Sequence, residues 1–297
     1  MKRLFPGFYP LSANELDEFD NNSVVVFGVT MLLDLYRING WKTFMDVIEE
    51  QIPREHRWLP YDSAWYYHNE LSSVISNEIS KTRTASMYLQ RFKEMINNPC
   101  HHPYLDSKLM SRFDKYISLI SEDIIKTEDI LNNNLSYGEL KQRIHRFYEG
   151  RIGEPYDNAQ MLQLQQEAKA RHKNQQNPCL SISNSHDERV KSNRYIVWKQ
   201  IQKYAKEVQR PISLVLNRIT YNWFAIYNDV IMPQPSLVNE FKLETGVDIH
   251  ITTVYDFINR LDIDSHRKEE ILKQLHNKPT LGNDQQIQFN TNDQQLI

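Results

Sequence analysis

Residues 24–37, VVVFGVTMLLDLYR, constrain the fold of this chain more than any other stretch. The β-branched and aromatic run 24–27 has the composition of a fully buried strand. It passes through Gly28 directly into an apolar helical pattern. A strand followed at once by a helix is typical of α/β proteins, which bind ligands at the carboxyl ends of parallel strands. Yet none of the turn residues 28–30 can ionise, so this turn offers no catalytic acid.

The same alternation of strand and helix returns in the second half of the chain. The segment 195–209 is amphipathic at helical spacing, and RPISLVLN, residues 210–217, has the composition of a buried strand. A helical pattern over 236–246 ends in a glycine, and VDIHITT, residues 247–253, follows as a final strand. This order predicts an α/β fold with a parallel sheet covered by helices on both faces.

We expect one domain over residues 1–278, with two interruptions. Residues from about 70 to 150 are rich in charge and poor in Gly and Pro, and their apolar positions recur at helical spacing, which predicts a long helical insertion. Residues from about 163 to 190 shift to Gln, Asn, Ser and Lys, a polar stretch that begins helical and ends as a loop. The polar tail 279–297 is expected to be disordered.

Composition excludes several classes of protein. Hydrophobic residues make up 40% of the 297 residues, which is ordinary for a globular protein, so the bulk of the chain should fold. The formal charge of −3 excludes a global basic field that attracts nucleic acid. Two cysteines cannot form a disulfide framework. With no signal peptide and no long apolar run, we expect a cytoplasmic protein that does not bind membranes.

Five motifs, in this order, resemble the bacterial PIN-like domain family, whose members have the PIN nuclease fold. The resemblance runs from LFPGFY to about YDFINRL and implies a PIN-like parallel sheet flanked by helices, with a long helical insertion. The motifs that carry it are VVVF…LLDLYR, RWLP…A…H, FYEGRIGEPY, IVWKQI…AKE…RPI…V…W and PQPSLVNEFKLETG.

The resemblance also implies a metal site, and here the sequence departs from the family. PIN nucleases cut RNA with carboxylates that hold Mg²⁺ or Mn²⁺ at the strand ends. Where the family has FDTN, ALEFH, GDLIxW and FVTDD, this chain has FGVT, AWYYH, NRYIVW and LVLNR. The four acids are thus replaced by Gly28, Tyr66, Arg194 and Asn217.

Our main hypothesis is therefore a catalytically inactive PIN-like protein, a pseudonuclease, with no catalytic residues and no metal or other cofactor. The guanidinium groups of Arg194 and Arg218 would repel a divalent ion at close range. The resemblance implies a binding or regulatory subunit in a bacterial phage-defence (antiviral) or toxin–antitoxin complex. Its protein partner would be encoded nearby.

The basic residues near this site allow a second interpretation. Arg194 and Arg218, together with Lys191 and Lys199, could bind the phosphates of RNA without cutting it. Alternatively, the arginines of an abandoned pocket simply pair with nearby acids, and the lysines form the solvated face of a helix.

A third hypothesis keeps the enzyme. An active endoribonuclease dependent on Mg²⁺ or Mn²⁺ could use relocated acids. Asp34, Asp62 and Glu70 are the candidates, because they follow or flank the degenerate positions in the sequence. These hypotheses leave open whether the chain is an enzyme, and the replacement of the four acids argues against one.

Overall fold

The computed structural model describes all residues except 98–99, 101–105, 182–184, 229 and 276–297, so the predicted disordered tail 279–297 lies outside its described part. The chain divides into two compact units. The first comprises Met1–Tyr67 and Arg146–Ile297, and the second His68–His145. None of the described helices is long and apolar enough to cross a membrane.

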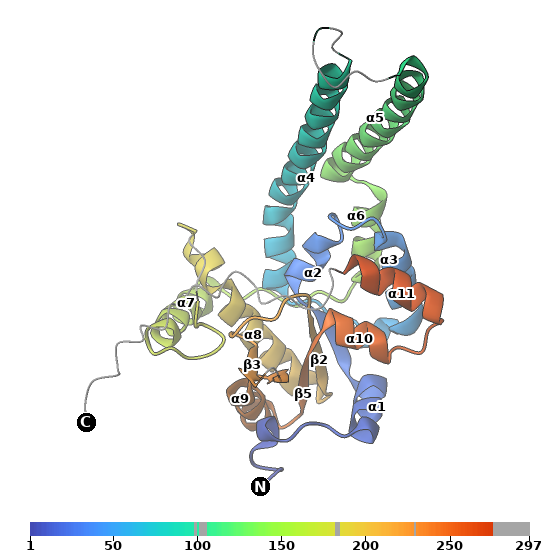
Figure 1. The fold of residues 1–297 in the computed structure, drawn as a ribbon. Coiled ribbons are helices and arrows are strands. Elements are labelled where there is room, and N and C mark those ends of the chain that lie inside the picture. The colour runs from blue at the N-terminus through green and yellow to red at the C-terminus, as the bar shows by residue number, and fades with distance from the viewer. Residues whose placement is uncertain (98–99, 101–105, 182–184, 229, 276–297) are drawn as a thin grey trace, which may run out of the picture. The chain divides into compact units, whose positions relative to one another are not determined.

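A three-stranded parallel sheet lies at the centre of the first unit (Figure 1). Its strands are β1 (Val24–Phe27), β2 (Ile212–Leu216) and β5 (Ile249–Thr253), in the order β1-β2-β5. All residues of β1 and β2 are buried, as their continuous apolar sequences predict. The α/β fold is confirmed, with a smaller sheet and more helix than the strand patterns alone suggest.

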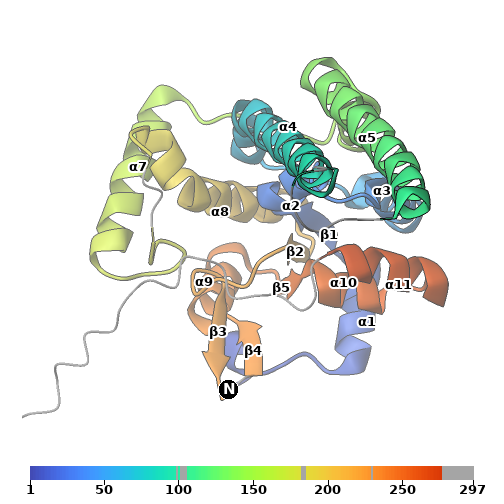
Figure 2. The same cartoon turned by 45° about the horizontal axis from the view of Figure 1, so that its top comes forward.

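Helices cover both faces of this sheet, as predicted (Figure 2). Alternate side chains of a strand point to opposite faces. Val26 belongs to a buried cluster with Trp198 and Phe241, on the face covered by α8 and α9. Phe27 contacts Phe44 and Phe257 from α3 and α10, with ring centroids 6.2 and 5.8 Å apart. The helices of this unit are α1 (Ala13–Asn22), α2 (Val29–Asp34), α3 (Trp41–Gln51), α7 (Asn158–Lys173), α8 (Glu188–Val208), α9 (Pro235–Thr245), α10 (Val254–Arg260) and α11 (Ser265–Gln274), with short 3₁₀ turns at Pro6–Phe8 and Arg54–His56.

An antiparallel hairpin follows β2 and was not predicted. It consists of β3 (Phe224–Tyr227) and β4 (Val230–Pro233). Asn228, in the connection, has a φ of 47°, a conformation that Asn adopts more readily than most residues. In the sequence FAIYNDVIMP, Asn228 lies between two apolar runs and therefore indicates a turn.

The polar stretch 163–190 contains more helix than its composition suggests. Helix α7 continues to Lys173, and α8 begins at Glu188, so the connection is shorter than predicted. A capping box between Asp157 and Gln160 starts α7, and Leu164 and Ala168 anchor it in the core beside α8. The two apolar side chains and the capping box thus stabilise a helix that is otherwise polar.

The second unit is mainly a pair of long helices. Helix α4 (Tyr61–Ile96) enters it at His68, and α5 (Ser107–Ser136) runs antiparallel to α4. Arg83 of α4 pairs with Glu128 of α5. Lys93, which comes later in α4, pairs with Asp114, which comes earlier in α5, so the two helices run in opposite directions. Helix α6 (Glu139–Phe147) follows α5, so helices cover most of the segment 70–150, whose periodicity is helical.

Candidate functional site

The turn after β1 lies directly against the end of β2. The backbone N–H of Gly28 donates to the carbonyl oxygen of Val215 at 2.8 Å. A Cβ atom at Gly28 would lie 2.8 Å from the Leu216 Cδ2 atom, so a side chain here requires Leu216 to shift. Gly28 also occupies the N-cap of α2, with no side chain to cap the helix. This is the strand end at which the family carries its first acid.

A polar network crosses this strand end. The Thr30 hydroxyl donates to the Asn217 Oδ1 atom at 2.6 Å, and the Asn217 amide donates to the Asp34 carboxylate. Arg37 donates to the other oxygen of Asp34, and the Arg218 Nη2 atom lies 3.8 Å from the Asp34 Oδ2 atom. Both carboxylate oxygens of Asp34 are therefore engaged.

Asp34, one of the candidate relocated acids, lies at the end of a short helix. Helix α2 has only six residues, so it is about 9 Å long, and its last residue is still within reach of Asn217 after β2.

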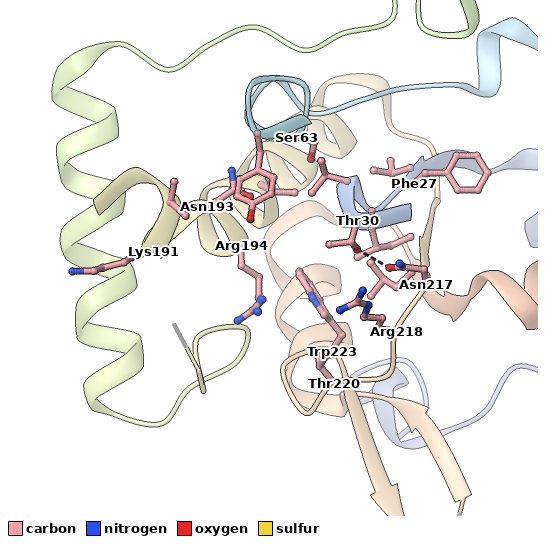
Figure 3. Close-up of a pocket in the computed structure, with 18 residues that line it drawn as sticks. Phe27, Thr30, Ser63, Lys191, Asn193, Arg194, Asn217, Arg218, Thr220 and Trp223 are labelled. Carbon is pink, nitrogen blue, oxygen red and sulfur yellow. Dashed lines mark hydrogen bonds between the residues drawn. The ribbon is translucent and has the colours of Figure 1, made fainter. Parts of the chain in front are cut away.

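A pocket of about 310 Å³ opens beside this network (Figure 3). The four positions that the sequence motifs align with family acids, Gly28, Tyr66, Arg194 and Asn217, all line it. The sequence-based alignment of four separate motifs onto one site is thus consistent with the geometry. The described lining residues include three bases and no acid; the bases are Lys191, Arg194 and Arg218.

Two of these bases flank the same tryptophan. In Figure 3, Arg194 and Arg218 lie on either side of Trp223, and Lys191 points away from them. The Arg194 Nη1 atom donates to the Ser181 carbonyl oxygen at 2.7 Å, and the Arg218 side chain is 54% exposed. Lys191 pairs with Glu188 at 2.8 Å. Lys199, the fourth predicted phosphate ligand, is half-buried on α8 and is not among the described residues that line the pocket.

The lining contributes hydrogen-bonding groups that sequence reasoning missed. Ser63, Asn193 and Thr220 line the pocket among its aromatic and basic residues. The Thr220 Oγ1 atom is buried and has no hydrogen-bond partner within the described part of the chain. A buried hydroxyl without a partner is costly, and a ligand oxygen at this position would satisfy it. Nothing in the sequence around Thr220 indicates this role.

The residues of this pocket do not fit a divalent ion. Mg²⁺ and Mn²⁺ need anionic oxygen ligands, and the lining supplies guanidinium and amide groups instead. Over the described ranges, no group of three or more His, Cys, Asp or Glu side chains is placed to hold a metal ion.

Asp62, the second candidate among the relocated acids, belongs to a different network from that of Asp34. Asp62 is fully buried, with Arg189 Nη2 at 2.7 Å and Gln200 Nε2 at 3.0 Å from its carboxylate. Burial raises the pKa of Asp62, and the bond from Arg189 counteracts that rise. Asp62 is absent from the described pocket lining, and Glu70 belongs to the second unit. Arg189, which also stacks over Trp65 at 4.1 Å, is thus part of a buried ion pair.

Comparison with known proteins gives one match. A family model described as PIN like domain matches residues 24–237, a span that includes β1, β2 and every residue of the pocket. No curated protein and no solved structure matches the chain.

Proposed function

The chain belongs to the PIN-like domain family, and we propose that it is a pseudonuclease that binds RNA in the strand-end pocket without cutting it. One observation carries the proposal. The four positions that the motif resemblance aligns with family acids line a single pocket, and the described lining has three bases and no acid.

Absence of cleavage follows from the chemistry of phosphodiester hydrolysis in this fold. Metal-dependent hydrolysis needs an ion that generates hydroxide and stabilises the charge of the transition state. Asp34 is a carboxylate bonded to Asn217 at the end of β2, and both its oxygens are engaged. An ion there would have to displace an amide and a guanidinium while Arg218 repels it.

Binding of RNA is supported by the donors in the pocket. A guanidinium has five N–H donors in a fork that matches a phosphate, so Arg194 can bind Ser181 and a phosphate together. Arg218 is half-exposed, and its 3.8 Å contact with Asp34 is longer than a hydrogen bond. Thr220 supplies a further donor, and Trp223 and Tyr66 supply aromatic surface for a base.

Titration of a fluorescently labelled single-stranded RNA, followed by anisotropy in EDTA, tests this proposal. We expect binding that weakens as salt rises, because phosphate contacts release counterions. Addition of Mg²⁺ should not strengthen it. Absence of binding in EDTA, with binding restored by Mg²⁺ or Mn²⁺, would contradict the proposal.

The proposed biological role is that of a binding or regulatory subunit. RNA that is held without turnover can control a partner protein, and the family resemblance suggests a bacterial phage-defence or toxin–antitoxin complex. Co-purification with the product of a neighbouring gene at fixed stoichiometry would support this role.

A further inference from the structure

The helical pair of the second unit buries one apolar stripe and exposes another. Ile79 and Ile96 of α4 and Ile117 and Leu131 of α5 are buried. A second set of large apolar side chains is between 48% and 66% exposed. We call it the outer stripe; it comprises Tyr88, Phe92 and Met95 of α4, and Leu109, Tyr116, Leu119, Ile120 and Ile130 of α5.

The outer stripe is continuous on each helix. At 3.6 residues per turn, Leu109, Tyr116 and Ile120 lie within about 40° of one another around α5. Tyr88, Phe92 and Met95 lie within about 60° of one another around α4. On a solvated helix these positions would be polar, so an apolar set of this extent indicates a surface that is covered in the functional protein.

The stripes of the two helices lie on the same side of the pair. Around the axis of each helix, the outer stripe lies about 100° from the buried stripe. Viewed from the N-terminus of each helix, this rotation has the same direction in α4 and α5. Because the helices are antiparallel, equal rotations bring both outer stripes to one side. The contact between Phe92 and Phe113, with ring centroids 5.5 Å apart, joins this side to the buried seam.

Charge is distributed unevenly along the helix that carries most of the outer stripe. The first ten residues of α5 hold three bases and one acid, and the rest of the helix holds one base and four acids. The basic part contains Lys108, Arg112 and Lys115 beside Asp114, and the acidic part contains Glu122, Asp123, Glu128 and Asp129 beside Lys126.

We propose that the outer stripe binds a second copy of this chain, so that two helical pairs form an antiparallel four-helix bundle. A two-fold axis across the helices places α5 of one copy antiparallel to α5 of the other, with the basic part of each facing the acidic part of its mate. A crossing point near residues 117–118 sets Arg112 opposite Asp123. A two-fold axis along the helices would instead place the basic parts of the two α5 helices at the same level. Charge complementarity thus selects a copy of the same chain as the occupant.

The size of the full-length protein in solution tests this proposal first. Light scattering after size exclusion should give a dimer, and Tyr116→Glu with Ile120→Glu should convert it to a monomer. The matched control is Leu243→Glu, which changes a residue 86% exposed on α9 and should leave the dimer intact. A wild-type monomer at 100 μM, about the highest practical concentration, or a dimer indifferent to the double change, would overturn the proposal.

A charge exchange tests the antiparallel arrangement without touching apolar residues. Arg112→Glu with Lys115→Glu makes both parts of α5 acidic, and Glu122→Lys with Asp123→Lys makes both parts basic. Each variant alone should dimerise at least tenfold more weakly than wild type, and an equimolar mixture should restore the dimer. These side chains are exposed, so circular dichroism should show unchanged helix content. Failure of the mixture to recover, or association with only a different protein through this face, would overturn the inference.

Discussion

Replacement of both Arg194 and Arg218 by alanine is expected to weaken the binding of single-stranded RNA by about 100-fold or more. A hydrogen bond to a charged group contributes about 1.5–3 kcal/mol, and every 1.4 kcal/mol is tenfold in affinity. Loss of two phosphate contacts should also reduce the slope of log affinity against log salt by about 1.4. Anisotropy titrations at three or more salt concentrations measure both quantities.

The matched control uses two other bases of α8, the helix that carries Arg194. Lys203 and Lys206 are exposed on α8 and are not among the described residues of the pocket. Their double replacement by alanine removes the same formal charge and should change affinity less than threefold. Because Arg194 also binds the Ser181 carbonyl, the single variant Arg218→Ala separates RNA binding from any local rearrangement and should cost at least tenfold. Equal losses of RNA affinity in the pocket variant and the control variant would mean that binding depends only on the total positive charge and not on the pocket.

Replacement of Glu240 by alanine should lower the free energy of unfolding by about 3 kcal/mol, because three donors then lose their acceptor. Glu240 accepts from Trp198 Nε1 at 2.9 Å, from Gln202 Nε2 at 3.0 Å and from Arg171 Nη2 at 2.6 Å. Trp198 is fully buried, so its N–H cannot turn to water. This one carboxylate joins α7, α8 and α9, and urea denaturation measures the loss.

Glu244 provides the comparison on the same helix. It pairs with Lys206 at 3.3 Å, and both side chains are about half-exposed. Such a surface ion pair contributes about 0–1 kcal/mol, so Glu244→Ala should be close to neutral. Glu240→Gln keeps an acceptor for Trp198 and should fall between the two alanine variants. Equal effects of Glu240→Ala and Glu244→Ala would show that the buried network does not stabilise the fold.

The parts of the fold that were predicted correctly rest on local patterns. The run from Val24 to Phe27 and the run from Ile212 to Leu216 are too apolar to be exposed, and both are fully buried strands of the parallel sheet. Ser12 and Gly246 cap α1 and α9 as their residue types suggest. The proximity of Gly28 and Asn217 could also be expected, because each follows one of two neighbouring parallel strands, whose ends meet at one edge of the sheet.

The sequence did not reveal contacts between residues that are distant along the chain. Asp34 was a candidate relocated acid, and the amide of Asn217, which comes 183 residues later, binds its carboxylate. Asp62 was a candidate metal ligand, and its burial against Arg189 depends on a helix more than 120 residues later. Spacing along one segment cannot reveal such pairings, because they arise when helices pack.

The central claim is that this pocket holds RNA but cannot support metal-dependent cleavage. Incubation of purified protein with a labelled RNA and Mg²⁺ or Mn²⁺, followed by gel electrophoresis, tests it most directly. The account predicts intact RNA at protein concentrations that bind all of it, with or without EDTA. Cleavage that EDTA abolishes and that is lost in the Asp34→Asn variant would contradict it.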